Sequence, residues 1–125
     1  MERYFTDGTE DSPSILFDND KGLIEIKGRS LPEDAITCYN PLYKLVKEYT
    51  TSPKQITTFN FRLGYLNSSS AKKILEVISL LENLPSQGFQ VNLNWFYNTE
   101  DEDMHEEGEE FKRMTDLPLT LVKEQ

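Results

Sequence analysis

The sequence lacks several features that common chemistries require. It has one cysteine, Cys38, so it offers no internal disulfide and no multi-cysteine zinc site, and we expect Cys38 to be a small packing residue. The single histidine, His105, has no evident relationship to Cys38 or to a serine, which argues against a catalytic triad. Neither a GxxxxGKS/T loop nor a GxGxxG turn is present. We therefore expect no catalytic residues, no bound metal and no cofactor.

Positive charge and long apolar runs are also scarce. Lys and Arg total 13 against 22 Asp and Glu, a formal net charge of -9. Such a field repels nucleic-acid backbones and anionic lipid head groups. The apolar runs fall far short of the roughly 20 residues that a membrane span needs, and the first residues lead into no secretory signal. We expect a cytoplasmic protein that binds neither nucleic acid nor membrane.

What is present suits one small domain. Of the 125 residues, 37% are hydrophobic and 11% aromatic, which is enough to form a core, and we expect residues 1–125 to fold as one unit. The first dozen residues are polar and contain Gly8. They predict an N-terminal arm, 1–12, that is loose or packs late.

Alternating and β-branched residues predict five strands. Residues 14–17 and 23–27 are joined by the turn-forming segment 18–22, and a last apolar run covers 119–122. Residues 56–65 and 89–97 alternate between apolar and polar side chains, as half-buried strands do. Their polar positions include Asn60, Arg62, Asn92 and Asn94.

Two segments have helical periodicity. In 32–49, apolar residues recur at spacings of four and three. Pro41 leaves two alternatives: the helix kinks there, or Asn40 caps a second helix that has Pro41 in its first turn. A second stripe predicts a helix that the segment 84–88 ends. That stripe consists of Ala71, Ile74, Leu75, Ile78 and Leu81. Helices between alternating strands predict an α/β fold: a mixed sheet with helices mainly on one face and an open polar face.

The segment 99–110 concentrates carboxylates and has three interpretations. It is a solvated acidic helix start, with Phe111 and Met114 as apolar anchors, or a docking surface for a basic partner. The third interpretation is a metal-dependent enzyme that uses Asp101, Asp103 and His105 as ligands, although the segment does not match an EF-hand.

The segment 64–72 lies where a predicted strand gives way to a helix. Free backbone amides and the positive end of the helix dipole favour an anion at such a position, including a phosphate on a hydroxyl. Asn67 and the serines Ser68, Ser69 and Ser70 are also common helix-capping residues, so capping alone is enough to explain the cluster, and one hydroxyl could serve both functions.

The sequence resembles the SiaC family of bacterial regulatory phosphoproteins over nearly its whole length. The resemblance is carried, in order, by 12–15 (SPSI), 28–34 (GRSLPED), 39–42 (YNPL), 65–72 (YLNSSSAK), 95–97 (WFY), 101–104 (DEDM) and 108–111 (GEEF). It implies a fold similar to anti-sigma-factor antagonists, which have the STAS fold.

The resemblance also implies a partner-switching function without enzymatic activity. A serine/threonine kinase phosphorylates such a protein, a PP2C-type phosphatase reverses this, and the unphosphorylated form binds and activates a diguanylate cyclase, which raises cyclic di-GMP and favours biofilm growth. The family acceptor is a threonine directly after Tyr-x-Asn, and that position is Ser68 in this chain, with Ser69 as the alternative acceptor.

We expect the partner-binding surface to surround this acceptor. It would comprise Tyr65, Asn67, Ser69, Ser70, Lys72, Arg29 and Glu33. Two other functions stay open at this point. One is a constitutive protein-binding adaptor in which the serines only cap a helix, and the other is the metal-dependent enzyme.

Overall fold

In the computed structural model, which describes residues 3–124, six strands lie in chain order across one sheet, β1-β2-β3-β4-β5-β6. The strands are β1 (Arg3–Thr6), β2 (Ser14–Asp18), β3 (Leu23–Ser30), β4 (Ile56–Leu66), β5 (Gln90–Asn98) and β6 (Leu119–Glu124). The first three pair antiparallel through short connections, and the pairs β3–β4, β4–β5 and β5–β6 are parallel. The predicted mixed sheet is confirmed.

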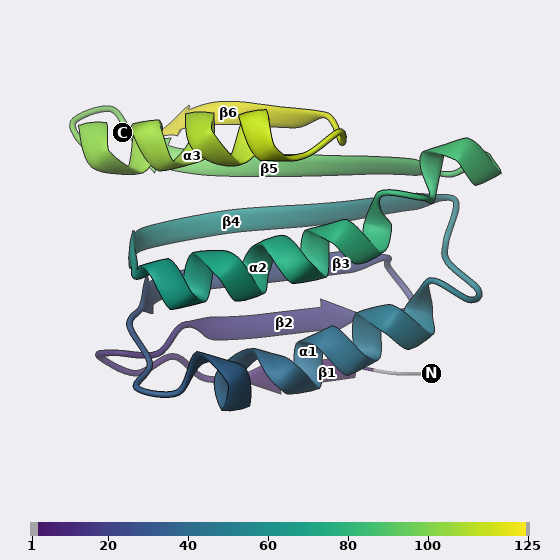
Figure 1. Ribbon diagram of the computed structural model, residues 1–125, viewed down its shortest axis with the longest axis horizontal. Helices are drawn as coiled ribbons and strands as arrows, with labels where there is room; N and C mark the ends of the chain where they lie inside the picture. The colour runs from purple at the N-terminus through teal and green to yellow at the C-terminus, as the bar shows by residue number, and fades with distance from the viewer. Residues whose placement is uncertain (1–2, 125) are drawn as a thin grey trace.

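Each parallel pair is joined by a crossover helix, as parallel strands require. The helices are α1 (Ala35–Tyr49), α2 (Ser68–Leu81) and α3 (Glu102–Met114), and a short 3-10 turn, η1 (Pro85–Gln87), precedes β5. Every crossover steps to the next strand in the same direction, and such connections share one hand, so all three helices lie on one face of the sheet (Figure 1). None of these helices within residues 3–124 has the length and apolarity to cross a membrane.

The core lies between the helices and one face of the sheet. Alternate positions of the central strands point into it, including Phe59 and Phe61 of β4 and Trp95 of β5. The rings of Phe59 and Phe61 stack at 4.2 Å, and the Trp95 indole donates a hydrogen bond of 2.9 Å to the Met104 carbonyl oxygen. That bond fixes α3 to the sheet. Cys38 packs half-buried against the core, as predicted.

The other face of the sheet is open and polar, as predicted. Asn94 donates a hydrogen bond of 2.9 Å to Asn60 on the neighbouring strand. Arg62 pairs with Glu25 at 3.4 Å and with Glu124, and its guanidinium lies 3.7 Å from the centroid of the Phe96 ring. Such cross-strand pairs stabilise an exposed sheet face.

The structure corrects one expectation about the N-terminal half and decides between the two alternatives for Pro41. The segment 1–12 is not a loose arm throughout, because Arg3–Thr6 forms the edge strand β1, which pairs with β2; Met1 and Glu2 lie outside the described residues. Pro41 does not begin a second helix after Asn40, since α1 runs continuously through it from the N-cap Asp34. Burial of the α1 stripe on both sides of Pro41 outweighs the hydrogen bond that proline cannot donate.

Candidate functional site

The turn between β4 and α2 is built around Asn67. This residue has an extended backbone (φ -89, ψ 170), and its side chain accepts a hydrogen bond of 2.9 Å from the backbone amide of Ser70. It is the N-cap of α2, and the helix starts at Ser68. The backbone amides of the first turn therefore lie at the position where the sequence predicted an anion-tolerant site.

Ser70 is fully buried, with 0% of its surface exposed. Its hydroxyl donates to the carbonyl oxygen of Ser30 at 3.2 Å and accepts from the Ser30 hydroxyl at 2.8 Å. Tyr39 of α1 completes this chain, because its hydroxyl lies 2.6 Å from that of Ser30. Burial raises the pKa of Tyr39 far above its ordinary value, so it remains a donor. Ser70 therefore holds α2 to β3 and α1 and is removed from the predicted partner surface.

The other two serines are exposed but differ in what they contact. The Ser69 hydroxyl donates a hydrogen bond of 3.2 Å to the Asn67 side chain. The Ser68 hydroxyl makes no hydrogen bond with any residue between 3 and 124. Among the serines of this turn, Ser68 is therefore the one whose hydroxyl takes no part in capping the helix.

The predicted partner residues separate into two places. Tyr65, at the end of β4, is 47% exposed, and Arg29 at the end of β3 lies over its ring, 5.8 Å from the centroid. Lys72 is exposed one turn after Ser68 on α2. The structure thus brings Tyr65, Asn67, Ser68, Ser69, Lys72 and Arg29 to one end of the sheet. Glu33 instead lines a separate hollow between the N-terminal segment and the start of α1.

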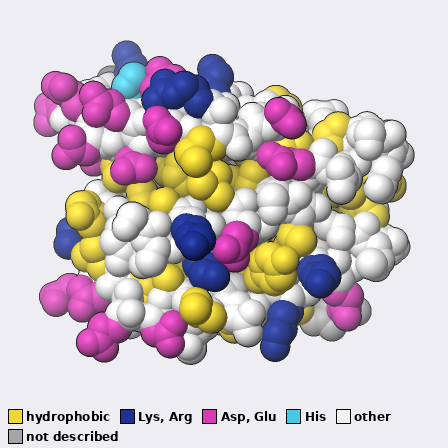
Figure 2. Space-filling model, in the orientation of Figure 1, with side chains coloured by type: hydrophobic (Ala, Val, Ile, Leu, Met, Phe, Trp, Pro, Cys, Tyr) yellow, Lys and Arg dark blue, Asp and Glu magenta, His cyan; other side chains and the backbone are white. Residues whose placement is uncertain are grey.

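A groove beside this turn was not predicted from the sequence. Helix α1 packs directly on α2, whereas α3 stands apart from α2, and an open groove runs between them. In Figure 2 apolar side chains gather between acidic and basic ones in this region. The lining residues are Ser68, Ala71, Lys72, Leu75, Glu76, Ser79, Glu107, Glu110, Phe111 and Met114.

Met114 corrects a prediction about α3. Phe111 is buried as expected, but Met114 is 56% exposed and lines the groove rather than anchoring the helix. Ala71 and Leu75, which belong to the predicted stripe of α2, are half-buried: they pack against the core and also line the groove. The spacing of the α2 stripe is that of an ordinary one-sided helix, so it gave no signal of the groove.

A second hollow adjoins the groove where the sheet divides. Strand β4 separates from β5 after the pair Phe61 and Trp95, and the end of β4 and one side of α3 then line this hollow. Glu107 and Glu110 line both hollows. Burial, together with Glu110 and Asp103, raises the pKa of Glu107 above its ordinary value. The α3 wall therefore presents a carboxylate crowded by like charges.

The residues of the metal hypothesis have other functions in the structure. Asp101 is the N-cap of α3 and accepts a hydrogen bond of 3.1 Å from the Met104 amide. His105 lies 3.7 Å from Glu109 and packs against Tyr97. Within residues 3–124 no three His, Cys, Asp or Glu side chains form a group that could hold a metal ion. The acidic segment is the start of α3, as its first interpretation predicted.

Comparison with known proteins decides the family. The family model for SiaC family regulatory phosphoproteins matches residues 6–124. The chain belongs to the SiaC family. A curated Pseudomonas aeruginosa protein, described as uncharacterised, is 29% identical over 114 residues, which cover 91% of this chain and 90% of that protein.

Two solved structures of the family are similar over almost the whole chain. The structure of SiaC of Pseudomonas aeruginosa has a TM-score of 0.89 and 26% identity, and the match covers 99% of this chain and 100% of that one. The second is SiaC as the activator in complex with the diguanylate cyclase SiaD, from the same organism; its TM-score is 0.90 at 27% identity, over 97% and 99% of the two chains. The SiaC fold is confirmed, and the likeness to anti-sigma-factor antagonists stays a prediction.

Proposed function

We propose that this SiaC-family chain is a non-enzymatic regulatory protein whose unphosphorylated form binds and activates a diguanylate cyclase. Support comes from the similarity of the whole chain to an activator of such a cyclase. We further propose that a serine/threonine kinase and a PP2C-type phosphatase add and remove a phosphoryl group on Ser68, in the cytosol, where ATP is available to the kinase. The output is then the level of cyclic di-GMP, and with it biofilm growth.

The observation that carries the choice of Ser68 is its hydroxyl, which is exposed and unbonded within residues 3–124. Ser69 donates to Asn67, and Ser70 is buried in the Tyr39–Ser30–Ser70 chain. A kinase needs an accessible hydroxyl, so Ser70 is excluded and Ser69 would first have to release Asn67. Ser68 follows Tyr65-Leu66-Asn67, the position of the family acceptor.

The phosphate would act on the contact with the partner rather than on the fold. A dianion at the first position of α2 is favoured by the free amides and by the helix dipole, so it stabilises this helix. Lys72 is four residues further on, within reach of such a phosphate on the same helix face. A dianion at an interface repels acidic partner groups and is costly to desolvate, so the partner is released.

A constitutive adaptor is the second candidate. It requires the polar cluster to be only a helix cap, and Asn67, Ser69 and Ser70 do fit that interpretation. It gives no reason for Ser68, because Asn67 already caps α2.

The deciding experiment is intact-mass spectrometry with fragment mapping after incubation with ATP and the kinase encoded beside this gene. We expect one added phosphoryl group at Ser68, none in Ser68→Ala, and normal modification of the matched control Ser69→Ala. If the wild-type protein gains no mass, the adaptor is the better explanation.

The consequence for binding is tested with the diguanylate cyclase. Ser68→Asp should weaken binding at least tenfold, because it places a carboxylate at the contact, while Ser68→Ala should bind within about twofold of wild type. Titration calorimetry or biolayer interferometry measures both. Equal affinities for the two variants would contradict the proposed switch.

A further inference from the structure

Arg29 differs from the other arginines of the chain in what it contacts. The chain has four arginines, and Arg3, Arg62 and Arg113 each pair with a carboxylate. The Arg29 guanidinium forms no such pair within residues 3–124 and instead lies over the Tyr65 ring, 5.8 Å from its centroid. A cation–π contact at an exposed site is weak. Arg29 is therefore a cation that an anion close by could attract away from the ring.

An irregularity in the sheet places Arg29 beside the turn that carries Ser68. The register between β3 and β4 shifts between Gly28 and Arg29, so that one residue of β4 is skipped and Arg29 pairs with Tyr65. Gly28 has a positive φ of 102°, a conformation that favours glycine. Such bulges change the direction of the side chains next to them. Arg29 and Tyr65 consequently lie together at the sheet end, three residues before Ser68.

Hydrogen bonds fix the end of β3 to the same turn. The carbonyl oxygen of Ser30, the residue after Arg29, accepts from the Asn67 backbone amide at 3.0 Å and from the Ser70 hydroxyl at 3.2 Å. Asn67 and Ser70 stand on either side of Ser68 in the chain. The backbone at Arg29 is thus held close to Ser68, while its side chain is exposed and free to change its contact.

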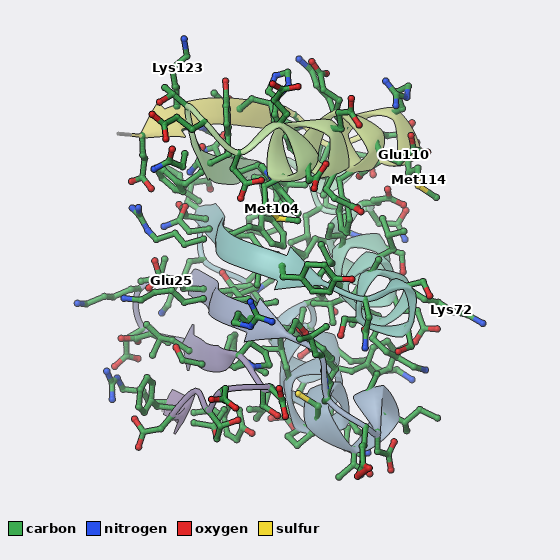
Figure 3. The ribbon with its side chains drawn as sticks, turned by 90° about the vertical axis from the view of Figure 1, so that its left-hand side faces the viewer. Glu25, Lys72, Met104, Glu110, Met114 and Lys123 are labelled. Carbon is green, nitrogen blue, oxygen red and sulfur yellow. The ribbon has the colours of Figure 1, made fainter. Side chains whose placement is uncertain are left out.

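Lys72 is a second cation near Ser68, and it forms no ion pair with a carboxylate among the residues that the structure describes. It lies one helical turn after Ser68 on α2. Figure 3 views the molecule from the sheet end at which β4 gives way to α2, and there Lys72 projects from the helical side, away from Glu25 on the open sheet face. Two cations without carboxylate partners therefore flank the serine.

The carboxylates around this turn lie on the α3 side. Glu107 and Glu110 line the groove together with Ser68, and Asp103 lines the adjoining hollow together with Tyr65. Their charges repel a phosphate on Ser68 and act to raise its pKa. A phosphate on Ser68 is therefore driven away from α3, towards the two cations.

The chain belongs to a family of regulatory phosphoproteins, so a phosphate is the anion expected at this turn. Resting on the proposed function, we infer that Arg29 senses the phosphate on Ser68. In the unphosphorylated protein Arg29 stacks on Tyr65. After phosphorylation it leaves the ring and forms a bidentate pair with the phosphate, which the Lys72 ammonium also contacts. Phosphorylation thus withdraws a cation from the predicted partner surface and uncovers Tyr65, besides adding negative charge.

The inference is tested by phosphorus NMR titration of the full-length protein phosphorylated on Ser68. We expect a phosphate pKa below its ordinary value of about 6, because cations close by favour the dianion. Arg29→Gln should raise this pKa by about half a unit, and Arg29→Lys, which keeps the charge without the planar fork, should lie between the two. The matched control Arg3→Gln removes an arginine from the edge strand β1 and should leave the pKa unchanged.

The release of Tyr65 gives a second measurement, which a purely structural role of Arg29 would not move. Phosphorylation of the wild-type protein should shift the ring proton resonances of Tyr65, because the guanidinium leaves the ring face. In Arg29→Gln the ring has no cation to lose, so phosphorylation should shift these resonances much less. Equal shifts in the two proteins would contradict the inference.

The outcomes separate this inference from the proposed function. If the kinase and ATP add no phosphoryl group to Ser68, the proposed function fails and the inference falls with it. If Ser68 is phosphorylated but Arg29→Gln leaves the phosphate pKa unchanged, or Arg3→Gln raises it equally, only the role of Arg29 is overturned. A phosphate pKa that rises in Lys72→Gln and not in Arg29→Gln would mean that the phosphate is held by its own helix, which also contradicts the inference.

Discussion

The two flanks of α2 are closed in different ways. On the α1 side, the helices pack directly, and the chain of hydroxyls from Tyr39 through Ser30 to Ser70 joins α1, β3 and the first turn of α2. On the α3 side, Leu75 is left half-buried and Met114 exposed along a groove. The closed flank fixes the first turn of α2, which carries Ser68, and the open flank leaves Ser68 at the edge of an accessible groove.

The open flank exists because α3 packs mainly on the sheet and little on α2. Gly108 lies so close to β5 and β6 that an added Cβ would be 2.5 Å from side-chain atoms of both Trp95 and Leu121. The hydrogen bond from the Trp95 indole to the Met104 carbonyl oxygen anchors the same helix one turn earlier. With two anchors on the sheet, α3 keeps its place with little packing on α2; the two helices are joined at their C-terminal ends, where the Thr115 hydroxyl donates a hydrogen bond of 2.7 Å to Glu82.

The largest expected effect comes from closing that approach with Gly108→Ala. In an unconstrained helix interior this change stabilises by about 1 kcal/mol. Here the buried Trp95 cannot move aside freely, so we expect a loss of about 1–3 kcal/mol in the free energy of unfolding, measured by urea titration.

The control for this prediction is Gly64→Ala, where no atom lies within 4 Å of the added Cβ. It should change stability by less than about 0.5 kcal/mol. If Gly108→Ala is as stable as wild type, close approach to the sheet is not what holds α3.

The closed flank is tested with neighbouring serines. Ser70→Ala leaves the Ser30 hydroxyl buried with fewer partners, and we expect it to cost about 1–3 kcal/mol in the free energy of unfolding. Ser68→Ala should stay within about 0.5 kcal/mol, because its hydroxyl is exposed. Urea unfolding measures both. Equal stabilities of the two variants would show that the buried chain contributes little.

A double variant tests whether these hydroxyls act as one unit. Ser30→Ala combined with Ser70→Ala should cost less than the sum of the single changes, because either change alone already removes the hydrogen bond between the two hydroxyls. Additive losses would argue for two independent hydrogen bonds.

The fold could be predicted where the order of apolar and polar residues within a single strand or helix indicates its type. The alternation in 56–65 and 89–97 predicted β4, β5 and the open polar face correctly. Strand β1 was missed because it is formed by pairing with β2, and the exposed Phe5 gives it no strong alternation. Continuity of α1 through Pro41 depends on burial against the sheet, which local propensity does not contain.

The position of the site at the start of a helix could be predicted, but the shape of the surface around it could not. The local sequence placed Asn67 and three serines at a helix start, and the structure agrees. Which serine is buried depends on Ser30, 40 residues earlier in the chain, and so could not be read from the cluster. The groove depends on how far α3 lies from α2, and that distance is not contained in the pattern of either helix.

The smallest effect concerns Glu107 on the open flank. Burial, with Glu110 and Asp103, raises its pKa in the folded protein, so the folded state binds this proton more tightly than the unfolded chain does. Stability therefore falls as pH rises from the unfolded pKa through the folded one. Glu107→Gln removes this penalty, and we expect a gain of up to about 0.5 kcal/mol at neutral pH, because the site is partly solvated.

The pH dependence separates this effect from a change in packing. Near pH 4, at about the unfolded pKa of a glutamate, most of the stability difference between Glu107→Gln and wild type should vanish, because protonated Glu107 is as neutral as the amide. Urea unfolding at both pH values measures it. In a Glu110→Gln background the gain at neutral pH should shrink, since one of the repelling charges is gone. A gain that is the same at both pH values would mean that the amide packs better, and that like-charge repulsion at Glu107 contributes little to stability.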